Sequence, residues 1–267
     1  MEKIAIIGAG WLGLPLGASL AAEGHVVFGT TTRKEKLPIM EEVGLKPQLW
    51  NFSKSPVEEL GFLAETDVLI LTLPPDITRT SFVLKLRKVI AAVKEVGICK
   101  VLYISSTSVY PAVNREMFEE EVVVSSRDDW DDGPIVEKEE VIRSEPSLSP
   151  TIIRFGGLFG PGRHPGEWMG GRKEVPGADS PVNFIHLTDC IGVIKEVIRQ
   201  GVWGETFNAV APEHPSKKDF YDRACADLGL ILPTWGKKPA PWKKVNSDKI
   251  IKRLGYTFVY SNPISAY

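Results

Sequence analysis

The sequence predicts an α/β protein built on a doubly wound parallel sheet, and two observations lead to this class. Runs of Val, Ile and Leu of strand length recur along the first part of the chain, and helical patterns separate them. The runs are continuous rather than alternating, which is typical of strands covered by helices on both faces. Strands and helices that alternate at this spacing form right-handed crossovers. The predicted strands are residues 3–10, 25–31, 67–73, 100–107 and 150–157.

Helical patterns lie between the predicted strands, and the composition of the sequence changes after Arg154. The stretches 12–24 and 78–97 read as helices, the first closing at Gly24. Residues 156–177 are rich in glycine and proline and are expected to form a long loop around a pocket. Further on, the pattern predicts helices at 187–201 and 216–229, a short helix from 247 that ends at Gly255, and a strand at 205–211.

This change of composition predicts that the chain is divided in two near residue 155. Residues 1–155 are expected to hold most of the sheet, and residues 156–267 form a mixed region that completes the sheet and adds a small C-terminal cap. A chain of 267 residues can bury a core of normal size without disulfides or metals.

Composition excludes several classes of protein. The formal net charge of −2 shows no basic excess, so no nucleic-acid partner is expected. The chain starts directly with a strand pattern and has no apolar run of membrane-spanning length, so neither a signal peptide nor a membrane partner is predicted. Cys99, Cys190 and Cys225 lack metal-like spacing with the four histidines, which indicates reduced thiols, no metal and a cytoplasmic location.

The strongest local motif is the glycine loop Gly8-Ala9-Gly10-Trp11-Leu12-Gly13 between the first strand and the first helix. Gly8 permits a tight turn, Gly10 lets the backbone approach a pyrophosphate, and Gly13 allows close packing of helix on strand. The helix that follows offers unpaired N–H groups to phosphates. The motif in this position predicts an NAD(P)-binding Rossmann domain over residues 1–155; the alternative is a glycine turn without a ligand.

The end of the second strand indicates which dinucleotide is bound. Sites for NAD usually place an acid there, to accept from the ribose hydroxyls. Here Thr30, Thr31 and Thr32 are followed by Arg33, whose guanidinium can grip a 2′-phosphate. The sequence therefore favours NADP, with NAD as an alternative cofactor, unless this stretch is only a solvated basic turn.

Hydroxyl side chains end the strand at 100–107. Ser105, Ser106, Thr107 and Ser108 stand where a parallel strand leaves the sheet. Ligands of open α/β sheets bind at such carboxyl ends. The alternative is that the hydroxyls only satisfy loop backbone.

Five stretches together carry a family resemblance: "IAIIGAGWLG", "LYISSTSVY", "TIIRFGGLFGPGRHP", "VNFIHLTDCIGVIKEVI" and "ETFNAVAPEHPSKKDFYDRACADLG". Taken in order over nearly the whole chain, they resemble the extended short-chain dehydrogenase/reductase superfamily of the NAD-dependent epimerase/dehydratase type. The chain is most similar to its small atypical branch, described as nucleoside-diphosphate-sugar epimerase-like. The resemblance implies a Rossmann domain with a small C-terminal substrate-binding cap.

The resemblance also implies roles for single residues. Ser106 matches the family's catalytic Ser/Thr. The cofactor would meet Ser105, Leu73 and Pro74, with Phe155 and Gly156 against the nicotinamide. The substrate would meet Thr107, Arg163, His164, Asn183 and His186, although His186 also suits a packing role at a strand end.

The family's Tyr-x-x-x-Lys pair is missing. The usual interval from Ser106 and the helix signature "EEVIR" both put the tyrosine at Asp131 and the lysine at Ile135. An exposed Asp is ionised at pH 7 and is a poor general acid. Three replacements are open. Asp131 itself could act if burial raised its pKa, unless it lies in a solvated acidic loop. Lys138, one helical turn beyond Ile135, could reach the ribose, and Tyr110, which ends the strand at 100–107, could lend a phenol.

Two functions stay open at this point. One is an oxidoreductase or epimerase-like enzyme that acts, with NADP(H), on a small-molecule substrate such as a sugar nucleotide or another polar carbonyl or alcohol. The other is a catalytically inactive NADP(H)-binding sensor that acts through a protein partner. A homodimer, formed through the helices that flank the serine strand, is compatible with either.

Overall fold

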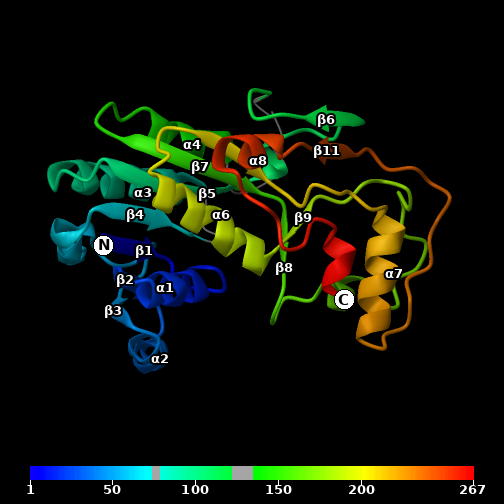
Figure 1. The fold of residues 1–267 in the computed structure, drawn as a ribbon, viewed down its shortest axis with the longest axis horizontal. Helices are drawn as coiled ribbons and strands as arrows, with labels where there is room; N and C mark the ends of the chain where they lie inside the picture. The colour runs from blue at the N-terminus through cyan, green and yellow to red at the C-terminus, as the bar shows by residue number, and fades with distance from the viewer. Residues whose placement is uncertain (74–78, 122–134) are drawn as a thin grey trace. The chain divides into compact units, whose positions relative to one another are not determined.

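The computed structural model of the protein, drawn as a ribbon in Figure 1, describes residues 1–73, 79–121 and 135–267. Its chain forms two compact units. Unit 1 comprises Met1–Ser105, Val124–Ile153 and Gly201–Thr206. Unit 2 comprises Ser106–Val123, Arg154–Gln200 and Phe207–Tyr267. Each unit is assembled from three stretches of chain, so the two interleave along the sequence; the predicted division at residue 155 stays a prediction.

A sheet of seven strands dominates the fold. Its strands are β1 (Lys3–Ile7), β2 (Val26–Thr31), β3 (Leu45–Leu49), β4 (Val68–Leu71), β5 (Lys100–Ser106), β7 (Ser149–Phe155) and β10 (Thr206–Ala209). They are ordered β10-β7-β5-β4-β1-β2-β3. The pairs β1–β2, β1–β4, β2–β3 and β4–β5 are parallel. The predicted α/β class with a parallel Rossmann sheet is confirmed.

Two smaller parallel ladders accompany this sheet. They pair β6 (Arg115–Met117) with β11 (Lys243–Val245), and β8 (Gly157–Phe159) with β9 (Phe184–His186).

Helices follow the strands in the order that the sequence predicts. The α-helices are α1 (Gly13–Ala22), α2 (Leu37–Glu42), α3 (Arg79–Glu95), α4 (Ile135–Arg143), α5 (Pro165–Met169), α6 (Leu187–Gln200), α7 (Lys217–Asp227) and α8 (Asp248–Leu254). The 3₁₀ turns are η1 (Lys34–Lys36), η2 (Val57–Glu59), η3 (Gly61–Glu65), η4 (Thr107–Val109) and η5 (Pro263–Ala266). The predicted helices that correspond to α1, α3, α6, α7 and α8 are confirmed. Within the described ranges, none of these helices has both the length and the apolar character needed to cross a membrane.

The core of unit 1 explains the continuous apolar runs. Every side chain from Ile4 to Ile7 in β1 and from Val68 to Leu71 in β4 is fully buried. Both faces of these strands are therefore covered. One face belongs to an apolar cluster that joins β1 and β4 to α3 and α4, with Phe82 and Ile142 among its buried members.

Aromatic rings form much of the core of unit 2. The ring of Phe184 stacks on Phe220 with centroids 4.4 Å apart, and both meet the edge of Phe159. A fully buried carboxylate, that of Asp189 in the first turn of α6, accepts hydrogen bonds from the Tyr256 hydroxyl at 2.8 Å and the Val259 amide at 2.7 Å. This carboxylate fastens the segment after α8 to α6.

The stretch 156–177, expected to be one long loop, is not loop throughout. The stretch contains β8 and the short helix α5. The helix starts where His164 accepts from the Gly166 amide and Pro165 occupies the first turn, a start signal that the surrounding glycines concealed. Its glycines lie mainly at turns, such as Gly160 and Gly162 with positive φ.

Candidate functional site

The glycine loop lies between β1 and α1, and its backbone geometry requires glycine at two of its three glycine positions. Gly8 has a φ of +108°, and a Cβ there would lie 2.7 Å from the carbonyl oxygen of Thr72. A Cβ on Gly13, the first residue of α1, would lie 2.4 Å from the carbonyl oxygen of Gly8. Gly10 is different, because it is exposed and a Cβ there would meet its nearest neighbour only at 3.9 Å. The open face of the loop is therefore at Gly10.

The start of α1 is suited to an anion. Its N-cap residue, Leu12, makes no side-chain cap, and its first turn carries no acidic residue. The first amides of a helix have no intrahelical acceptor and lie at the positive end of its dipole. Trp11 is half-buried and Leu12 is buried beside this end. The loop fits a dinucleotide pyrophosphate, as the glycine spacing predicts.

Threonine hydroxyls fix the loop from two neighbouring strands. The Gly8 amide donates to Thr30 Oγ1 at 2.9 Å, and Thr72 Oγ1 donates to the Gly8 carbonyl oxygen at 2.6 Å. Thr72 belongs to the segment after β4, where Leu73 packs against the core cluster of unit 1. Pro74, the other residue expected beside the cofactor there, lies outside the described residues.

The end of β2 carries one buried and two exposed candidates. Thr31 is 7% exposed, and its hydroxyl accepts from the Arg33 amide at 3.3 Å, which fixes the turn. Thr32 is exposed. The Arg33 side chain is 58% exposed, with its Nε 4.0 Å from Glu35 Oε1, so this ion pair is weak and leaves the guanidinium accessible to a ligand.

Ser105 and Lys138 lie in a buried part of unit 1. The Ser105 hydroxyl donates to Glu139 Oε1 at 2.6 Å, and Glu139 is 2% exposed. Lys138 is 3% exposed, and its ammonium lies 4.4 Å from the centroid of the Phe82 ring. Both side chains thus have buried partners in α4 or α3. These contacts favour structural roles, and the assignments of Ser105 to the cofactor and Lys138 to catalysis stay predictions.

The candidate catalytic serine begins a tight turn in unit 2. We call residues 106–110, which include η4, the serine turn. Ser106 Oγ accepts from the Ser108 amide at 3.1 Å and lies 3.1 Å from the Ser108 hydroxyl. Thr107 is buried, whereas Ser106 is half-buried. The Ser106 hydroxyl can therefore cap the turn and still reach a ligand.

Tyr110 closes the serine turn in a buried network. Its phenol donates to Asn208 Oδ1 at 2.7 Å and accepts from an Arg154 guanidinium nitrogen at 2.7 Å. The same nitrogen of Arg154 lies 2.9 Å from the Glu119 carbonyl oxygen. Burial raises the pKa of the Tyr110 phenol, and the Arg154 charge and hydrogen bond offset part of this rise. These contacts favour a structural role for Tyr110, and its assignment as a proton donor stays a prediction.

Lys243 is a residue at this turn that the sequence analysis did not single out. Its ammonium donates to the carbonyl oxygens of Thr107 at 2.9 Å and of Tyr110 at 2.6 Å. It comes from β11, far along the chain, and its neighbours in sequence match no motif. The sequence around Lys243 therefore gives no indication that it contacts the serine turn.

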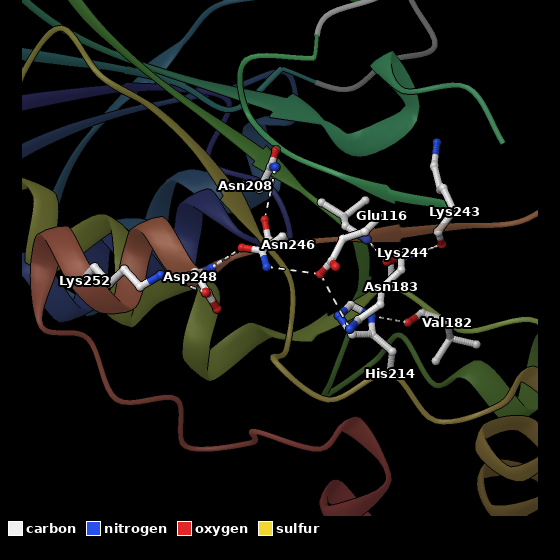
Figure 2. Close-up of polar contacts among 11 residues, drawn as sticks. Glu116, Val182, Asn183, Asn208, His214, Lys243, Lys244, Asn246, Asp248 and Lys252 are labelled. Carbon is white, nitrogen blue, oxygen red and sulfur yellow. Dashed lines mark hydrogen bonds and ion pairs between the residues drawn. The ribbon is translucent and has the colours of Figure 1, made fainter. Parts of the chain in front are cut away.

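Asn183, a predicted substrate residue, uses its amide to hold β11. Its Nδ2 donates to the Lys243 carbonyl oxygen at 2.8 Å, and its Oδ1 accepts from the Val245 amide at 2.7 Å. Figure 2 shows the Lys243 side chain pointing away from Asn183. The amide of Asn183 therefore has protein partners on both sides.

The predicted substrate histidines differ in their surroundings. His186 Nδ1 accepts from the Thr188 amide at 3.2 Å, its ring contacts Phe159 and Tyr260, and burial lowers its pKa. It is therefore neutral near pH 7. His164 Nε2 lies 3.4 Å from Asp227 Oδ2.

The remaining predicted site residues lie on turns and strand ends. Arg163 is exposed and pairs its backbone with Gly160. Phe155 ends β7 and is 2% exposed, and a Cβ on Gly156 would lie 2.4 Å from the Asn183 carbonyl oxygen. Gly156 thus permits a close approach of two backbones.

Of the two positions where the family has its Tyr-Lys pair, only one lies within the described residues. Ile135, at the position of the family's lysine, begins α4. Asp131, at the position of the tyrosine, lies outside the described residues. Among the residues that are described, no group of three or more His, Cys, Asp or Glu side chains is arranged to hold a metal ion.

Comparisons with known structures agree with this fold. The chain superposes on a functionally unknown conserved protein from Silicibacter pomeroyi with a TM-score of 0.79, at 22% identity over 100% of this chain and 96% of the other. MoeE5, solved in complex with UDP-glucose and NAD, gives 0.78 at 15% identity over 99% and 96%. The human epimerase family protein SDR39U1, solved with NADPH, gives 0.72 at 16% identity over 99% and 97%. The fold is that of the extended short-chain dehydrogenase/reductases of the NAD-dependent epimerase/dehydratase type, as the five stretches of sequence predict.

Sequence comparison adds a family. No family model matches the chain. Protein YeeZ of Escherichia coli strain K12 is 30% identical over 276 aligned residues, which cover 99% of this chain and 98% of the relative. The chain belongs to the same protein family as Protein YeeZ.

Proposed function

We propose that the protein is an NADP(H)-dependent oxidoreductase or epimerase-like enzyme with a non-standard proton donor. The observation that carries this proposal is the glycine loop, where Gly8 and Gly13 have no room for a side chain and Gly10 is open. A turn that served only to connect β1 to α1 would not need an open glycine before an uncapped helix start. A dinucleotide pyrophosphate needs both.

The choice of NADP(H) rests on the end of β2. Arg33 is the exposed cation that would meet a 2′-phosphate, and the exposed hydroxyl of Thr32 stands next to it. A charge-assisted hydrogen bond of this kind contributes about 1.5–3 kcal/mol, or roughly ten- to a hundredfold in affinity. Related folds have been solved with either cofactor, NAD in MoeE5 and NADPH in SDR39U1.

The nicotinamide, when bound, would accept or donate a hydride. The chain's own contribution would come from the serine turn, where the half-buried Ser106 hydroxyl would orient a carbonyl or alcohol oxygen. The substrate would be a polar carbonyl or alcohol, such as a sugar nucleotide, in line with the UDP-glucose held by MoeE5. Arg163 is one of the exposed cations of the predicted substrate loop and would suit an anionic part of that substrate.

A second candidate is a catalytically inactive NADP(H) sensor. Two observations favour it: the phenol of Tyr110 is engaged by Asn208 and Arg154, and Lys138 is buried over Phe82. Neither is arranged as a mobile proton donor in its own unit. In such a sensor the glycine loop would still bind NADP(H), and Ser106 would have no catalytic role.

Cofactor binding is tested by titrating the protein with NADPH and NADH while following fluorescence. Arg33→Ala is expected to weaken NADPH binding ten- to a hundredfold and to leave NADH binding nearly unchanged. Lys34→Ala, which removes the adjacent exposed cation, is the matched control. Failure of the parent protein to bind either nucleotide would overturn the proposal at its base.

Turnover separates the enzyme from the sensor. A panel of carbonyl compounds and sugar nucleotides is followed by absorbance at about 340 nm, where reduced nicotinamide absorbs. Activity that is lost in Ser106→Ala and kept in Ser108→Ala supports the enzyme, because Ser108 belongs to the same turn and is exposed. Activity that survives Ser106→Ala contradicts the role of Ser106.

A further inference from the structure

Four exposed aliphatic side chains gather in unit 2, directly after α7. They belong to residues 228–232, which we call the apolar tip: Leu228, Leu230, Ile231 and Leu232. The most exposed of them is Ile231, at 81%. Exposed apolar side chains that stand singly are normal on a protein surface, whereas a contiguous apolar patch marks an interaction site. The apolar tip therefore indicates a partner.

The apolar tip has a well-held backbone. Gly229 follows α7 with a φ of +64°, and the Leu230 amide donates to the Cys225 carbonyl oxygen at 2.9 Å. Beyond the tip, Trp235 packs against a buried cluster of unit 2, and its indole nitrogen donates to Asp222 Oδ1 at 2.9 Å. The backbone is thus held on both sides of the tip, while the aliphatic side chains face solvent.

A second segment of unit 2 pairs with the tip and with the residues that follow it. The Gly171 amide donates to the Ile231 carbonyl oxygen at 2.8 Å, and the Gly177 amide donates to that of Lys238 at 3.0 Å. These hydrogen bonds lie at the two ends of a short ladder formed by residues 171–177 and 231–238. The ladder therefore starts at the apolar tip.

This ladder, which we call the cationic ladder, has an excess of positive charge. It contains four cations, Arg172, Lys173, Lys237 and Lys238, and one acid, Glu174. All five side chains are exposed. Within the described ranges of the chain, none of the four cations forms an ion pair. The apolar tip is therefore flanked by positive charge.

These two features together select the kind of partner. Aliphatic side chains offer no stacking platform to bases, so a nucleic acid is not favoured. A second copy of the chain, docked by a two-fold axis on this same surface, would bring two cationic ladders face to face. An anionic bilayer suits both features, because aliphatic side chains enter the boundary of headgroups and acyl chains while Lys and Arg meet the phosphates.

We propose that the apolar tip and the cationic ladder dock on the surface of an anionic lipid bilayer. This inference goes beyond the proposed function and does not depend on it. No membrane partner is predicted from the sequence, because no apolar run is long enough to span a bilayer; a protein that lies on the surface needs no such run. The apolar and the electrostatic contributions act together, since stable attachment takes two signals.

Sedimentation of the 267-residue chain with lipid vesicles tests the docking. Vesicles of equal parts phosphatidylcholine and phosphatidylglycerol are expected to bind the protein, and added salt is expected to weaken this binding by screening the cations. Vesicles of phosphatidylcholine alone are expected to bind at least about tenfold more weakly. Absence of binding to the anionic vesicles, or equal binding to both kinds, would overturn the proposal.

The contribution of the apolar tip is tested by Ile231→Glu. The variant replaces the most exposed apolar side chain with one that the anionic surface repels, so the partition coefficient on anionic vesicles is expected to fall at least about tenfold. Leu84→Glu is the matched control, because Leu84 is an aliphatic residue of α3, in unit 1, that is 57% exposed. An equal effect of the two variants would contradict docking through the tip.

The contribution of the cationic ladder is tested by Lys237→Gln combined with Lys238→Gln. Each cation near an anionic surface contributes about fivefold, so the partition coefficient is expected to fall roughly 25-fold. Lys54→Gln combined with Lys252→Gln removes the same charge from two exposed lysines outside the ladder and is the matched control. Equal losses in the two double variants would show that binding follows net charge, and the proposal would fall.

Sedimentation velocity without lipid tests the other occupant of the tip. A dimer that Ile231→Glu dissociates would show that a second copy covers the tip, which would overturn docking on a bilayer. Thermal unfolding is the control for folding, and every variant is expected to match the parent because the substituted side chains are exposed. Failure of the parent to bind NADPH would remove the proposed function and leave the vesicle result unaffected.

Discussion

The glycine loop and the serine turn are both tight backbone structures at the ends of strands, but they are held in different ways. The tightest contact of the glycine loop is between its own residues, since Gly13 packs on Gly8 within the same few positions of sequence, and the hydroxyls of Thr30 and Thr72 add one hydrogen bond each. The serine turn is shaped from a distance, by Arg154, Asn208 and Lys243. A local sequence motif can therefore predict the glycine loop but not the serine turn.

This difference has consequences for substitution. A change within the glycine loop should act through steric exclusion, at the position where it is made. A change at the serine turn should act through polar groups that are left buried without partners, in residues remote along the chain.

The largest effect is expected at Tyr110. Tyr110→Phe removes the hydroxyl and leaves two buried groups, Asn208 Oδ1 and an Arg154 nitrogen, without this partner. Each such loss costs about 1–3 kcal/mol, so the free energy of unfolding should fall by roughly 2–6 kcal/mol. Urea unfolding measures it. A fall well below 1 kcal/mol would show that the network does not hold the turn.

The same variant separates structure from catalysis. If the phenol is structural, folded Tyr110→Phe protein at low temperature should retain most of the turnover. If the phenol is the proton donor, turnover should fall by about 10²–10⁴-fold even where the variant is fully folded. Far-UV circular dichroism at the assay temperature is the control.

The next effect is expected at Gly13. A Cβ there would lie 2.4 Å from the Gly8 carbonyl oxygen, so Gly13→Ala must displace backbone and should lower the free energy of unfolding by about 1–3 kcal/mol.

Gly10→Ala is the matched substitution, because its Cβ has space in the protein. It should leave stability within about 0.5 kcal/mol and still weaken NADPH binding, since the open position is where the cofactor would approach. Thermal unfolding and a fluorescence titration measure the two quantities. Equal destabilisation by both alanines would contradict the steric explanation.

The smallest destabilisation by loss of a contact is expected at Thr72. Its hydroxyl donates to the Gly8 carbonyl oxygen at 2.6 Å, and the nearly isosteric Thr72→Val removes this hydrogen bond. The free energy of unfolding should fall by about 1 kcal/mol. Urea unfolding measures this loss, and Thr66→Val is the control. The Thr66 hydroxyl donates to the Phe62 carbonyl oxygen, away from the glycine loop. NADPH affinity should fall only at Thr72.

Most of the sheet could be predicted from the sequence because its strands are buried on both faces. The stretch 67–73 shows this, since Val68–Leu71 are fully buried and carry nothing but apolar side chains. The strand β3 was not predicted, because it is an edge strand whose sequence "LKPQL" contains Pro47 and buries only Leu45. The ladder of β6 and β11 was missed as well, since three-residue strands carry too little periodicity.

In the candidate site, too, some residues could be predicted from the sequence and others could not. The steric need for glycine at positions 8 and 13 could be predicted from a short motif, whereas the role of Gly10 at the cofactor stays a prediction. Lys243 could not, because the contact with Thr107 and Tyr110 joins positions far apart in sequence and has no motif of its own. Tyr110 was singled out from the sequence, but its partners Asn208 and Arg154 were not visible there.

The interleaving of the two units bears on how the chain is made. Unit 1 is completed only by residues 201–206, where the Ile152 amide donates to the Glu205 carbonyl oxygen and the Thr151 hydroxyl donates to that of Val202. During translation, at roughly 5–20 residues per second, the segment that supplies these acceptors leaves the ribosome about 2–10 s after β7. For that interval β7 has unpaired edge groups while most of unit 1 is already synthesised. The growing chain therefore passes through a stage in which the β7 edge of the sheet awaits its last partner.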